Sequence, residues 1–447
     1  MSTLTRMYVK HVLENIEKSI TLETISMAKS FILHTLSCSY SGHDSKCTNS
    51  ALKIIKKHYR SFESIIWFNK CETNPLEAGF VNSIMAQIIL HEDIHRNSNT
   101  HPGIIVIPCA LSIGEYVHAN GNQIIRAIIS GYEIIGKFGK AASTDEFAKR
   151  GYRPTSIIGS FGSCVVAGLL MGLTENELVN AIGLTGNLIS GVNEWAYSGT
   201  DDLFVQNGAA TRNGILAAYF AKEGFESSDK ILEGNAGICN AYGLSAEKLA
   251  TECKISSPLE ISNTFIKKAP ACALVQTTAQ IAFELIDYHI NIDDILYGVI
   301  NTFYLSKHYP GCDNPGPFSS SLQARMSNQY NLAAILKHKK IANDIYYDYD
   351  NPDINLLSSK LTVYHDKKLD EEFPLNQPVD IYLKLKNGKI IQKKKNNPVY
   401  LNNQEIMNNF INTCSNYLSN SSINKAIELV EKIEKLDDIN ELTNIIR

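Results

Sequence analysis

The amino-acid sequence predicts a mainly α-helical protein with a large all-helical domain and a smaller second domain of the α+β class. Residues 1–268 carry apolar side chains at intervals of three and four positions, which is the spacing of one helix face. Residues 269–395 contain runs of β-branched and aromatic residues that are typical of strands. Residues 396–447 return to helical spacing and are expected to pack on the first domain.

Helices of the first domain are predicted to pack closely in a buried bundle. The segments "ETISMAKSFILHTLSC" (23–38) and "GNQIIRAIISGYEIIGKFGKAAS" (121–143) show the apolar stripe of helices that cover a core. Glycine and alanine are dense in "GSFGSCVVAGLLMG" (159–172) and "GAATRNGILAAYFA" (208–221). Small residues at helical spacing let two helices approach closely, so we expect a tightly packed helical domain.

The second domain is predicted to be an α/β unit. Strand signals occur in three segments: "DDILYGVINTFYLS" (293–306), "SSKLTVYHD" (358–366) and "VDIYLKLKNGKIIQKKK" (379–395). Within the last segment, Asn387-Gly388 is a two-residue turn between arms of alternating apolar residues, which predicts a β-hairpin. Between the strands, "SLQARMSNQYNLAAILKHKKI" (321–341) has the spacing of a helix.

Composition and charge narrow the possible partners. The 42 basic and 46 acidic residues leave a net charge of −4 and a pI near 6.3, which argues against nucleic acid or an anionic membrane as a partner. Apolar runs such as "SCVVAGLLMGL" are too short to span a bilayer, and the N-terminus lacks the apolar core of a signal peptide. Ten cysteines without a C-x-x-C pair argue against a disulfide framework. We expect a soluble, cytoplasmic protein that binds a small molecule.

The stretch "HEDIHRNSNTHPG", which begins at His91, contains a zinc-binding pattern. His91, Glu92 and His95 spell H-E-x-x-H, and His101 falls where a metzincin places its third zinc ligand. However, Ser98 replaces the glycine at which a metzincin turns its chain, and "THPG" ends the helix. A zinc hydrolase is therefore an alternative that predicts stoichiometric zinc. The other interpretation places His91 and Glu92 at a helix end.

The same stretch resembles the D-D-T-H-R-x-S-x-T-H-P-G segment of the MmgE/PrpD family, which includes 2-methylcitrate dehydratase and cis-aconitate decarboxylase. Further segments resemble the family in the same order, among them "AKSFILHTLSCSYSG", "HPGIIVIPCALSIGEY", "RGYRPTSIIGSFGSCVVAGLLMGL" and "IKKAPAC". The resemblance covers about residues 20–440. It implies a helical domain completed by the C-terminal segment, an α/β lid domain, a homodimer, and a site between the domains that needs no metal or other cofactor.

The resemblance also implies a reaction that begins with proton abstraction next to a carboxylate and continues with loss of water or carbon dioxide. Such a reaction needs a general base, a general acid and groups that hold carboxylates. Carried over residue by residue, the catalytic candidates are His101 of the T-H-P segment, Lys267 in place of the K-P-Y lysine, and Tyr330 as the lid-domain tyrosine. The alternatives are a capping role for His101 and a core position with a satisfied hydroxyl for Tyr330.

Further residues become substrate-binding candidates by the same comparison: Asp93, His95, Arg96, Arg153, Leu90, Ile94 and Leu203. Asp93 keeps an acidic family position, as does Glu92, where glutamate replaces aspartate. Leu90, Ile94 and Leu203 are apolar where the family has aspartate, threonine and lysine. Arg153 stands where the family has histidine; a guanidinium can bind a carboxylate through two hydrogen bonds but cannot act as a base at neutral pH. The alternative for Arg153 is a structural ion pair.

The leading prediction is therefore a cofactor-independent lyase of this family that acts on a small carboxylate-bearing metabolite. A tricarboxylate needs several charge-assisted contacts, each worth about 1.5 to 3 kcal/mol, and the leucine that replaces a lysine supplies none. We expect a substrate other than 2-methylcitrate or cis-aconitate. Besides the zinc hydrolase, two alternatives stay open: an isomerase, epimerase or cyclase of the same family in a biosynthetic pathway, and a catalytically inactive homologue.

Overall fold

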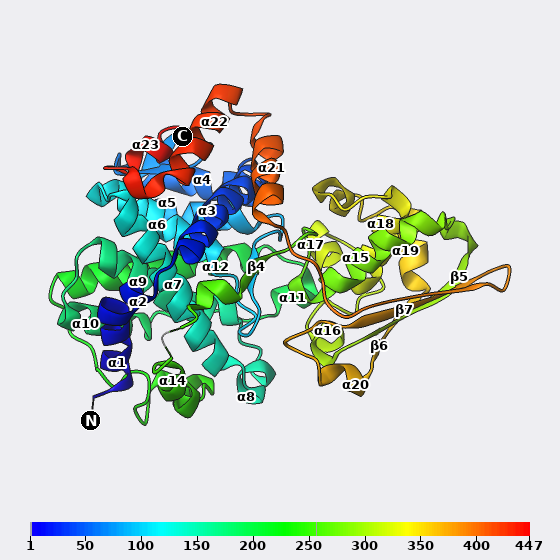
Figure 1. Ribbon diagram of the computed structural model, residues 1–447, viewed down its shortest axis with the longest axis horizontal. Coiled ribbons are helices and arrows are strands. Elements are labelled where there is room, and N and C mark those ends of the chain that lie inside the picture. Colours follow the sequence, from blue (N-terminus) through cyan, green and yellow to red (C-terminus); the bar gives the residue numbers. More distant parts are fainter. Residues whose placement is uncertain (1, 256) are drawn as a thin grey trace.

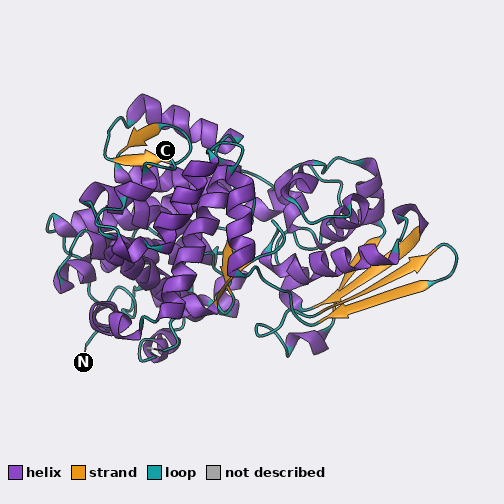
Figure 2. Ribbon diagram, turned by 45° about the horizontal axis from the view of Figure 1, so that its top comes forward, coloured by secondary structure: helices purple, strands orange, loops and turns teal. Residues whose placement is uncertain are grey.

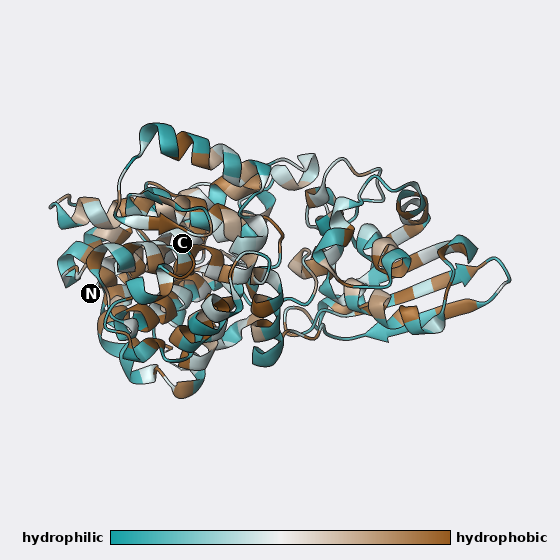
Figure 3. Ribbon diagram, turned by 90° about the horizontal axis from the view of Figure 1, so that it is seen from above, coloured by the Kyte–Doolittle hydropathy of each residue, from teal (hydrophilic) through white to brown (hydrophobic). Residues whose placement is uncertain are grey.

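The computed structural model describes residues 2–255 and 257–447, and Figure 1 shows two bodies joined side by side. The larger body is helical and contains both chain termini, whereas the smaller one combines a sheet with helices. The predicted mainly helical fold with a smaller α/β domain is confirmed. Apolar residues concentrate in the interior of the larger body (Figure 3). Among the helices in these two ranges, none combines the length and the hydropathy that a bilayer crossing requires.

The helical domain is built around long, buried helices. In chain order its helices are α1 (Leu4–Lys10), α2 (Ile16–Ser19), α3 (Leu22–Gly42), α4 (Lys46–His58), α5 (Pro75–Gln87), α6 (Gly103–Val117), α7 (Gly121–Ala142), α8 (Asp145–Lys149), α9 (Pro154–Leu170), α10 (Glu175–Thr185), α11 (Trp195–Ser198), α12 (Asp202–Lys222), α13 (Ile238–Tyr242) and α14 (Ala246–Glu252). A β-carbon at Gly214 of α12 would lie 2.1 Å from Ser163 Oγ and 2.5 Å from the Cys164 backbone nitrogen of α9. The small residues therefore allow α9 and α12 to pack closely.

Two short antiparallel ladders lie within the helical domain. β1 (Ser64–Ile66) pairs with β2 (Cys71–Thr73), and β3 (Asp93–His95) pairs with β4 (Thr264–Ile266). The sequence predicts helices alone here, because strands of three residues are too short for an alternation of apolar and polar residues to be recognised. The second ladder joins two segments that lie far apart in the sequence, and both of them lead to the candidate site.

The second domain contains a four-stranded mixed sheet with the order β6-β5-β7-β8. Its strands are β5 (Ile295–Thr302), β6 (Leu361–His365), β7 (Val379–Leu385) and β8 (Ile390–Lys395). β5 and β6 are parallel, and the other pairs are antiparallel. The hairpin predicted at Asn387-Gly388 is confirmed, because this turn joins β7 to β8 and Gly388 has a φ of +89°, where glycine is favoured.

Helices lie against this sheet (Figure 2). The helices of this domain are α15 (Gln276–Glu284), α16 (Tyr304–His308), α17 (Ser321–Met326), α18 (Asn328–His338), α19 (Pro352–Ser359) and α20 (Lys367–Asp370). Of these, α15, α16, α18 and α19 contact the sheet. The single helix predicted over 321–341 is in fact two helices, α17 and α18. Ser327 separates them because its backbone is extended and its hydroxyl accepts a hydrogen bond from the Tyr330 backbone nitrogen, which makes it the N-cap of α18.

The last segment of the chain returns to the helical domain. α21 (Asn403–Cys414) and α22 (Asn420–Glu431) pack against α3, and α23 (Asn440–Thr443) packs against α6. Figure 1 shows these red and orange helices beside the blue helices from the start of the chain. The second domain is therefore inserted between two parts of one helical body.

Candidate active site

A small cavity lies where the two domains meet. Its wall includes Glu92, His101 and Arg153 from the helical domain, and Cys272 and Tyr309 from the second domain. The centres of water-sized molecules can occupy about 30 Å³ of the cavity, which is room for about two water molecules. The two domains thus enclose a site that is nearly closed.

The β3–β4 ladder brings Lys267 to Glu92. Glu92 precedes the first residue of β3 and Lys267 follows the last residue of β4, so the antiparallel pairing places them side by side. The Lys267 ammonium donates to the Leu90 carbonyl oxygen at 2.7 Å and to Glu92 Oε1 at 3.1 Å. Lys267 is fully buried. It therefore lies behind the cavity wall and affects the cavity by pairing with Glu92.

Glu92 is a buried carboxylate on the cavity wall. Burial alone would raise the pKa of this carboxyl group, but the Lys267 ammonium and His101 hold the pKa of Glu92 below its ordinary value. Oε1 faces Lys267 and lies 3.6 Å from His101 Nδ1. Oε2 has no hydrogen-bond partner among the described residues. Glu92 is thus ionised at neutral pH and keeps one oxygen free.

His101 lines the cavity with a neutral imidazole. Its Nδ1 lies 2.6 Å from the Asp93 carbonyl oxygen. A carbonyl oxygen can only accept a hydrogen bond, so Nδ1 carries the proton and Nε2 is left with a free electron pair. Burial lowers the pKa of His101 to about 4, although Glu92 opposes that shift. The side chain retains 16% of its surface exposed, so it is reachable from the cavity.

Arg153 is a buried cation without an anionic partner. It immediately precedes α9 and is 3% exposed. Its guanidinium donates to the side-chain oxygen of Asn207 and lies 5.7 Å from the ring centre of Trp195. Burial lowers the pKa of Arg153 to about 10, so the group is still charged at pH 7. None of the carboxylates in the described residues pairs with it, and a buried charge without a counter-charge is costly. An anionic ligand would remove that cost.

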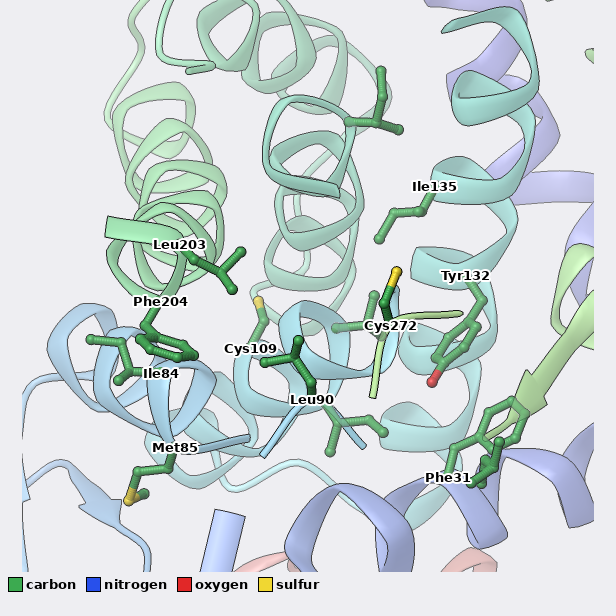
Figure 4. Packing of buried hydrophobic residues seen from close by; sticks show 14 of the residues in the cluster. Phe31, Ile84, Met85, Leu90, Cys109, Tyr132, Ile135, Leu203, Phe204 and Cys272 are labelled. Carbon is green, nitrogen blue, oxygen red and sulfur yellow. The ribbon is translucent and has the colours of Figure 1, made fainter. Parts of the chain in front are cut away.

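Two of the three apolar candidates are on the cavity wall. Leu90 and Leu203 are buried there together with Cys272 (Figure 4). Leu90 has a φ of +52°, which is unfavourable for a branched side chain, and its carbonyl oxygen accepts the hydrogen bond from Lys267. The third candidate, Ile94, lies in β3 and is not among the wall residues.

Asp93 lies behind the cavity wall and caps a helix. Its carboxylate accepts hydrogen bonds from the Gly103 backbone nitrogen at 3.1 Å and from the Tyr132 hydroxyl at 2.7 Å. It therefore binds the N-terminus of α6. Burial raises the pKa of Asp93 to about 7, even though both hydrogen bonds favour the charged form.

His95 and Arg96 also have partners away from the cavity. His95 Nε2 lies 2.9 Å from Glu260 Oε2 in the interior of the helical domain. The Arg96 guanidinium lies over the Phe265 ring at 4.5 Å and donates to the Leu375 carbonyl oxygen at 2.9 Å. Because Leu375 belongs to the second domain, Arg96 connects the two domains rather than the cavity walls.

The tyrosine on the cavity wall is Tyr309, not Tyr330. Tyr330 is fully buried in the second domain, where its hydroxyl donates to the Ile345 carbonyl oxygen at 2.6 Å. This is the core position that was its alternative interpretation. Tyr309 donates to Asn193 Oδ1 at 3.2 Å, and burial raises its pKa, so it keeps its proton at neutral pH. The sequence signal for Tyr309 was its place in the turn-rich "HYPGCDNPGP", since loops often carry functional residues.

The H-E-x-x-H pattern does not form the helical pair of a zincin. α5 ends at Gln87, and the pattern runs through an extended segment into β3. His91 Nε2 lies 2.9 Å from the Lys267 carbonyl oxygen, whereas His95 Nε2 bonds to Glu260. The two imidazoles therefore have separate partners. The zinc-hydrolase alternative required both histidines on one helix, and that prediction is wrong.

Comparisons with known proteins also divide the chain into two domains. The profile of the MmgE/PrpD N-terminal domain matches residues 7–249, and that of the MmgE/PrpD C-terminal domain matches residues 269–435. A cis-aconitate decarboxylase of Aspergillus terreus is 23% identical over 398 residues, which cover 83% of this chain and 81% of the relative. The cis-aconitate decarboxylase of Homo sapiens is 22% identical over 454 residues, which cover 96% and 91%. With both domain profiles matched over most of its length, the chain belongs to the MmgE/PrpD family.

Proposed function

We propose that this protein is a lyase that removes a proton next to a carboxylate and then releases carbon dioxide or water from a small metabolite. One observation carries the proposal: an unpaired, buried guanidinium, Arg153, shares a cavity wall with the Glu92–His101 pair. The cavity thus offers a carboxylate-binding cation and a base backed by a carboxylate in one enclosed space. Relatives named cis-aconitate decarboxylase support this reaction class.

Arg153 is the proposed carboxylate-binding group. A guanidinium matches a carboxylate with two parallel hydrogen bonds. Lys267 is already paired with Glu92, so Arg153 is the cation on the described part of the wall that is free to pair with a substrate. One free cation suits a substrate with one or two carboxylates better than a tricarboxylate. Leu90 and Leu203 add apolar surface that suits an alkyl portion of the same molecule.

His101 is the proposed general base. Its Nε2 would accept the proton next to the carboxylate, and the imidazolium that forms would be stabilised by Glu92, whose Oε1 lies 3.6 Å from His101 Nδ1. Lys267 keeps Glu92 ionised for this purpose. Tyr309, which is protonated at neutral pH, would donate a hydrogen bond to the enediolate. The His101 imidazolium would then return its proton, either to a departing hydroxyl, which leaves as water, or to the carbon that loses carbon dioxide.

A product screen in D₂O tests the reaction class. The purified protein is incubated in D₂O with a panel of mono-, di- and tricarboxylates that includes 2-methylcitrate and cis-aconitate. Mass spectrometry then measures the masses of the products. We expect loss of carbon dioxide or water from a molecule with one or two carboxylates. Uptake of deuterium without loss of mass would instead identify an isomerase, epimerase or cyclase. Absence of exchange and of turnover across the panel would support the inactive homologue.

The role of Arg153 has a matched control in Arg150. Arg153→Ala is expected to lower kcat/KM for the substrate found in the screen by roughly 10- to 150-fold, the effect of losing a contact worth about 1.5 to 3 kcal/mol. Arg150 is exposed and pairs with Glu146 on its own helix, so Arg150→Ala should leave kcat/KM unchanged. Equal losses in the two variants would contradict the proposed carboxylate site.

Three further expectations belong to the same proposal. Turnover is expected to survive exhaustive chelation, because none of the proposed steps uses a metal or another cofactor. Light scattering is expected to report a homodimer, as the resemblance implies. The cytoplasmic location stays a prediction that cell fractionation would test.

A further inference from the structure

Three side chains that commonly bind metal ions lie together behind the cavity wall. They are His34, Cys38 and His91, and their ligand atoms all lie within 4.8 Å of one another. His34 and Cys38 are buried, whereas His91 is only partly buried. The cluster is therefore enclosed but retains a side from which an ion could enter.

The fold brings these residues together from two elements. His34 and Cys38 are four residues apart on α3, so they lie on one face of that helix, one turn apart. His91 comes from the segment between α5 and β3, and its ring centre lies 5.0 Å from that of His34. The H-E-x-x-H pattern predicted two metal ligands four residues apart on one helix, at His91 and His95. In the structure, His34 and Cys38 of α3 have that spacing.

The distances suit a tetrahedral ion once the His91 carbonyl oxygen, which lies 2.7 Å from His34 Nε2, has moved aside. Zinc binds histidine nitrogen at about 2.0 to 2.1 Å and cysteine sulfur at about 2.3 Å, so tetrahedral geometry places the two ligand atoms about 3.6 Å apart. Cys38 Sγ lies 3.5 Å from His34 Nε2, which already matches. The remaining separations are at most 4.8 Å, so a shift of about 1 Å by the His91 side chain would complete three bonds.

The two imidazoles of the cluster are in the state that binds a metal ion, whereas the Cys38 thiol must first lose its proton. Burial lowers the pKa of His34 to about 4 and lowers that of His91, so both imidazoles are neutral and able to donate an electron pair. Burial raises the pKa of the Cys38 thiol, which would therefore lose a proton when it binds an ion. His34 Nδ1 is buried and has no hydrogen-bond partner among the described residues. His34 Nε2 donates to the His91 carbonyl oxygen at 2.7 Å, and an ion would replace this hydrogen bond.

We propose that His34, Cys38 and His91 bind one transition-metal ion of the zinc class, with water in the fourth position. The sulfur-and-imidazole donor set selects zinc, cobalt or copper over magnesium and calcium, which prefer oxygen. His91 Nε2 also holds the Lys267 carbonyl oxygen at 2.9 Å, so the ion would lie directly behind the residues that carry Glu92 and Lys267. The proposed site is separate from the proposed lyase chemistry and does not depend on it.

Cobalt titration of the full chain, after removal of metal by a chelator, tests the site. We expect saturation at one Co²⁺ per chain, with the visible bands of a tetrahedral ion and a near-ultraviolet band from a thiolate ligand. Cys38→Ser should remove the near-ultraviolet band. Cys164→Ser, which changes another buried cysteine of the helical domain, should retain it. Absence of the band in the unaltered protein, or its persistence in Cys38→Ser, would overturn the proposal.

X-ray absorption of the zinc-loaded, unaltered protein tests the same site without a variant, and so it decides even if Cys38→Ser fails to fold. The expected shell has one sulfur at about 2.3 Å and two imidazole nitrogens at about 2.0 Å. A shell without sulfur, or with two or more sulfurs, would place the ion elsewhere. Neither experiment measures turnover, so its result is independent of whether the proposed lyase activity is found.

Discussion

Glu92 and Asp93 are adjacent carboxyl groups whose environments move their pKa values in opposite directions. Successive residues of an extended chain face opposite sides. Glu92 faces the cavity, where Lys267 holds its pKa low, and Asp93 faces the interior, where burial raises its pKa to about 7. One carboxyl group is therefore suited to support a charged intermediate in the cavity, while the other binds the start of α6 at a cost that depends on pH.

Asp93→Asn is expected to change how stability depends on pH. Because the pKa of Asp93 is raised from 3.8 to about 7 on folding, its contribution to stability is fully present below about pH 4 and is lost as the pH rises through 7. Asparagine does not titrate and can still bond to Gly103 and Tyr132. Relative to the unaltered protein, Asp93→Asn should gain on the order of 3 to 4 kcal/mol between pH 4 and pH 8. Urea unfolding at both pH values measures this difference.

Asn49→Ala provides the control for that measurement. Asn49 is exposed on α4 and carries no titratable group, so its replacement should give a difference in unfolding free energy that stays nearly constant over the same pH range. A constant difference for Asp93→Asn as well would show that Asp93 titrates normally in the folded protein.

At the scale of elements, two contacts build the cavity wall. The β3–β4 ladder sets Lys267 against Glu92, and the close packing of α9 on α12 sets Arg153 against Asn207 and near Leu203. The first contact depends on backbone pairing, and the second depends on small residues that allow two helices to touch. The positions of the charged groups therefore depend on residues that have no chemistry of their own.

Gly214→Ala is expected to force α9 and α12 apart. The added methyl group would lie 2.5 Å from the Cys164 backbone nitrogen and 2.5 Å from the Ser160 carbonyl oxygen, and backbone atoms cannot move aside as a flexible side chain can. We expect a loss of about 1 to 3 kcal/mol in the free energy of unfolding, measured by denaturant titration. Val205→Ala on the exposed face of the same helix should cost far less, and equal losses would contradict the packing argument.

At the scale of the whole molecule, we expect the two domains to separate when a substrate enters. The enclosed part of the cavity has room for about two waters, which is less than a dicarboxylate needs. Arg96 joins the domains, since it lies on the Phe265 ring and donates to the Leu375 carbonyl oxygen. The structure thus corresponds to a closed arrangement in which Arg96 is one of the contacts that opening would break.

Arg96→Ala is expected to favour the open arrangement. Without the bond to Leu375, the segment 373–377 should exchange its backbone hydrogens faster, and hydrogen exchange with mass spectrometry measures that rate. Arg60→Ala is the control, because Arg60 is exposed just beyond the end of α4 and its side chain bonds to the Lys56 carbonyl oxygen of that helix, away from the second domain. Unchanged exchange in Arg96→Ala would show that this contact does not hold the domains together.

The sequence by itself determined features that depend on neighbours along the chain. Helical period predicted the first domain, and Asn387-Gly388 predicted the hairpin, because a helix turn and a two-residue loop are local structures. The family resemblance named His101 and Arg153, which line the cavity.

Only the tertiary structure decided which groups meet. Lys267 and Glu92 are 175 residues apart, and the strands that join them are too short to leave a pattern. Tyr309 lies on the cavity wall and Tyr330 does not, because packing buries α18 on all sides around Tyr330 and leaves the loop after α16 at the domain boundary. Tertiary contacts also decided the conformation of "HEDIHRNSNTHPG". Its sequence matches a zinc motif that requires a helix, but pairing with β4 makes the segment extended. His91 and His95 therefore bond to different partners.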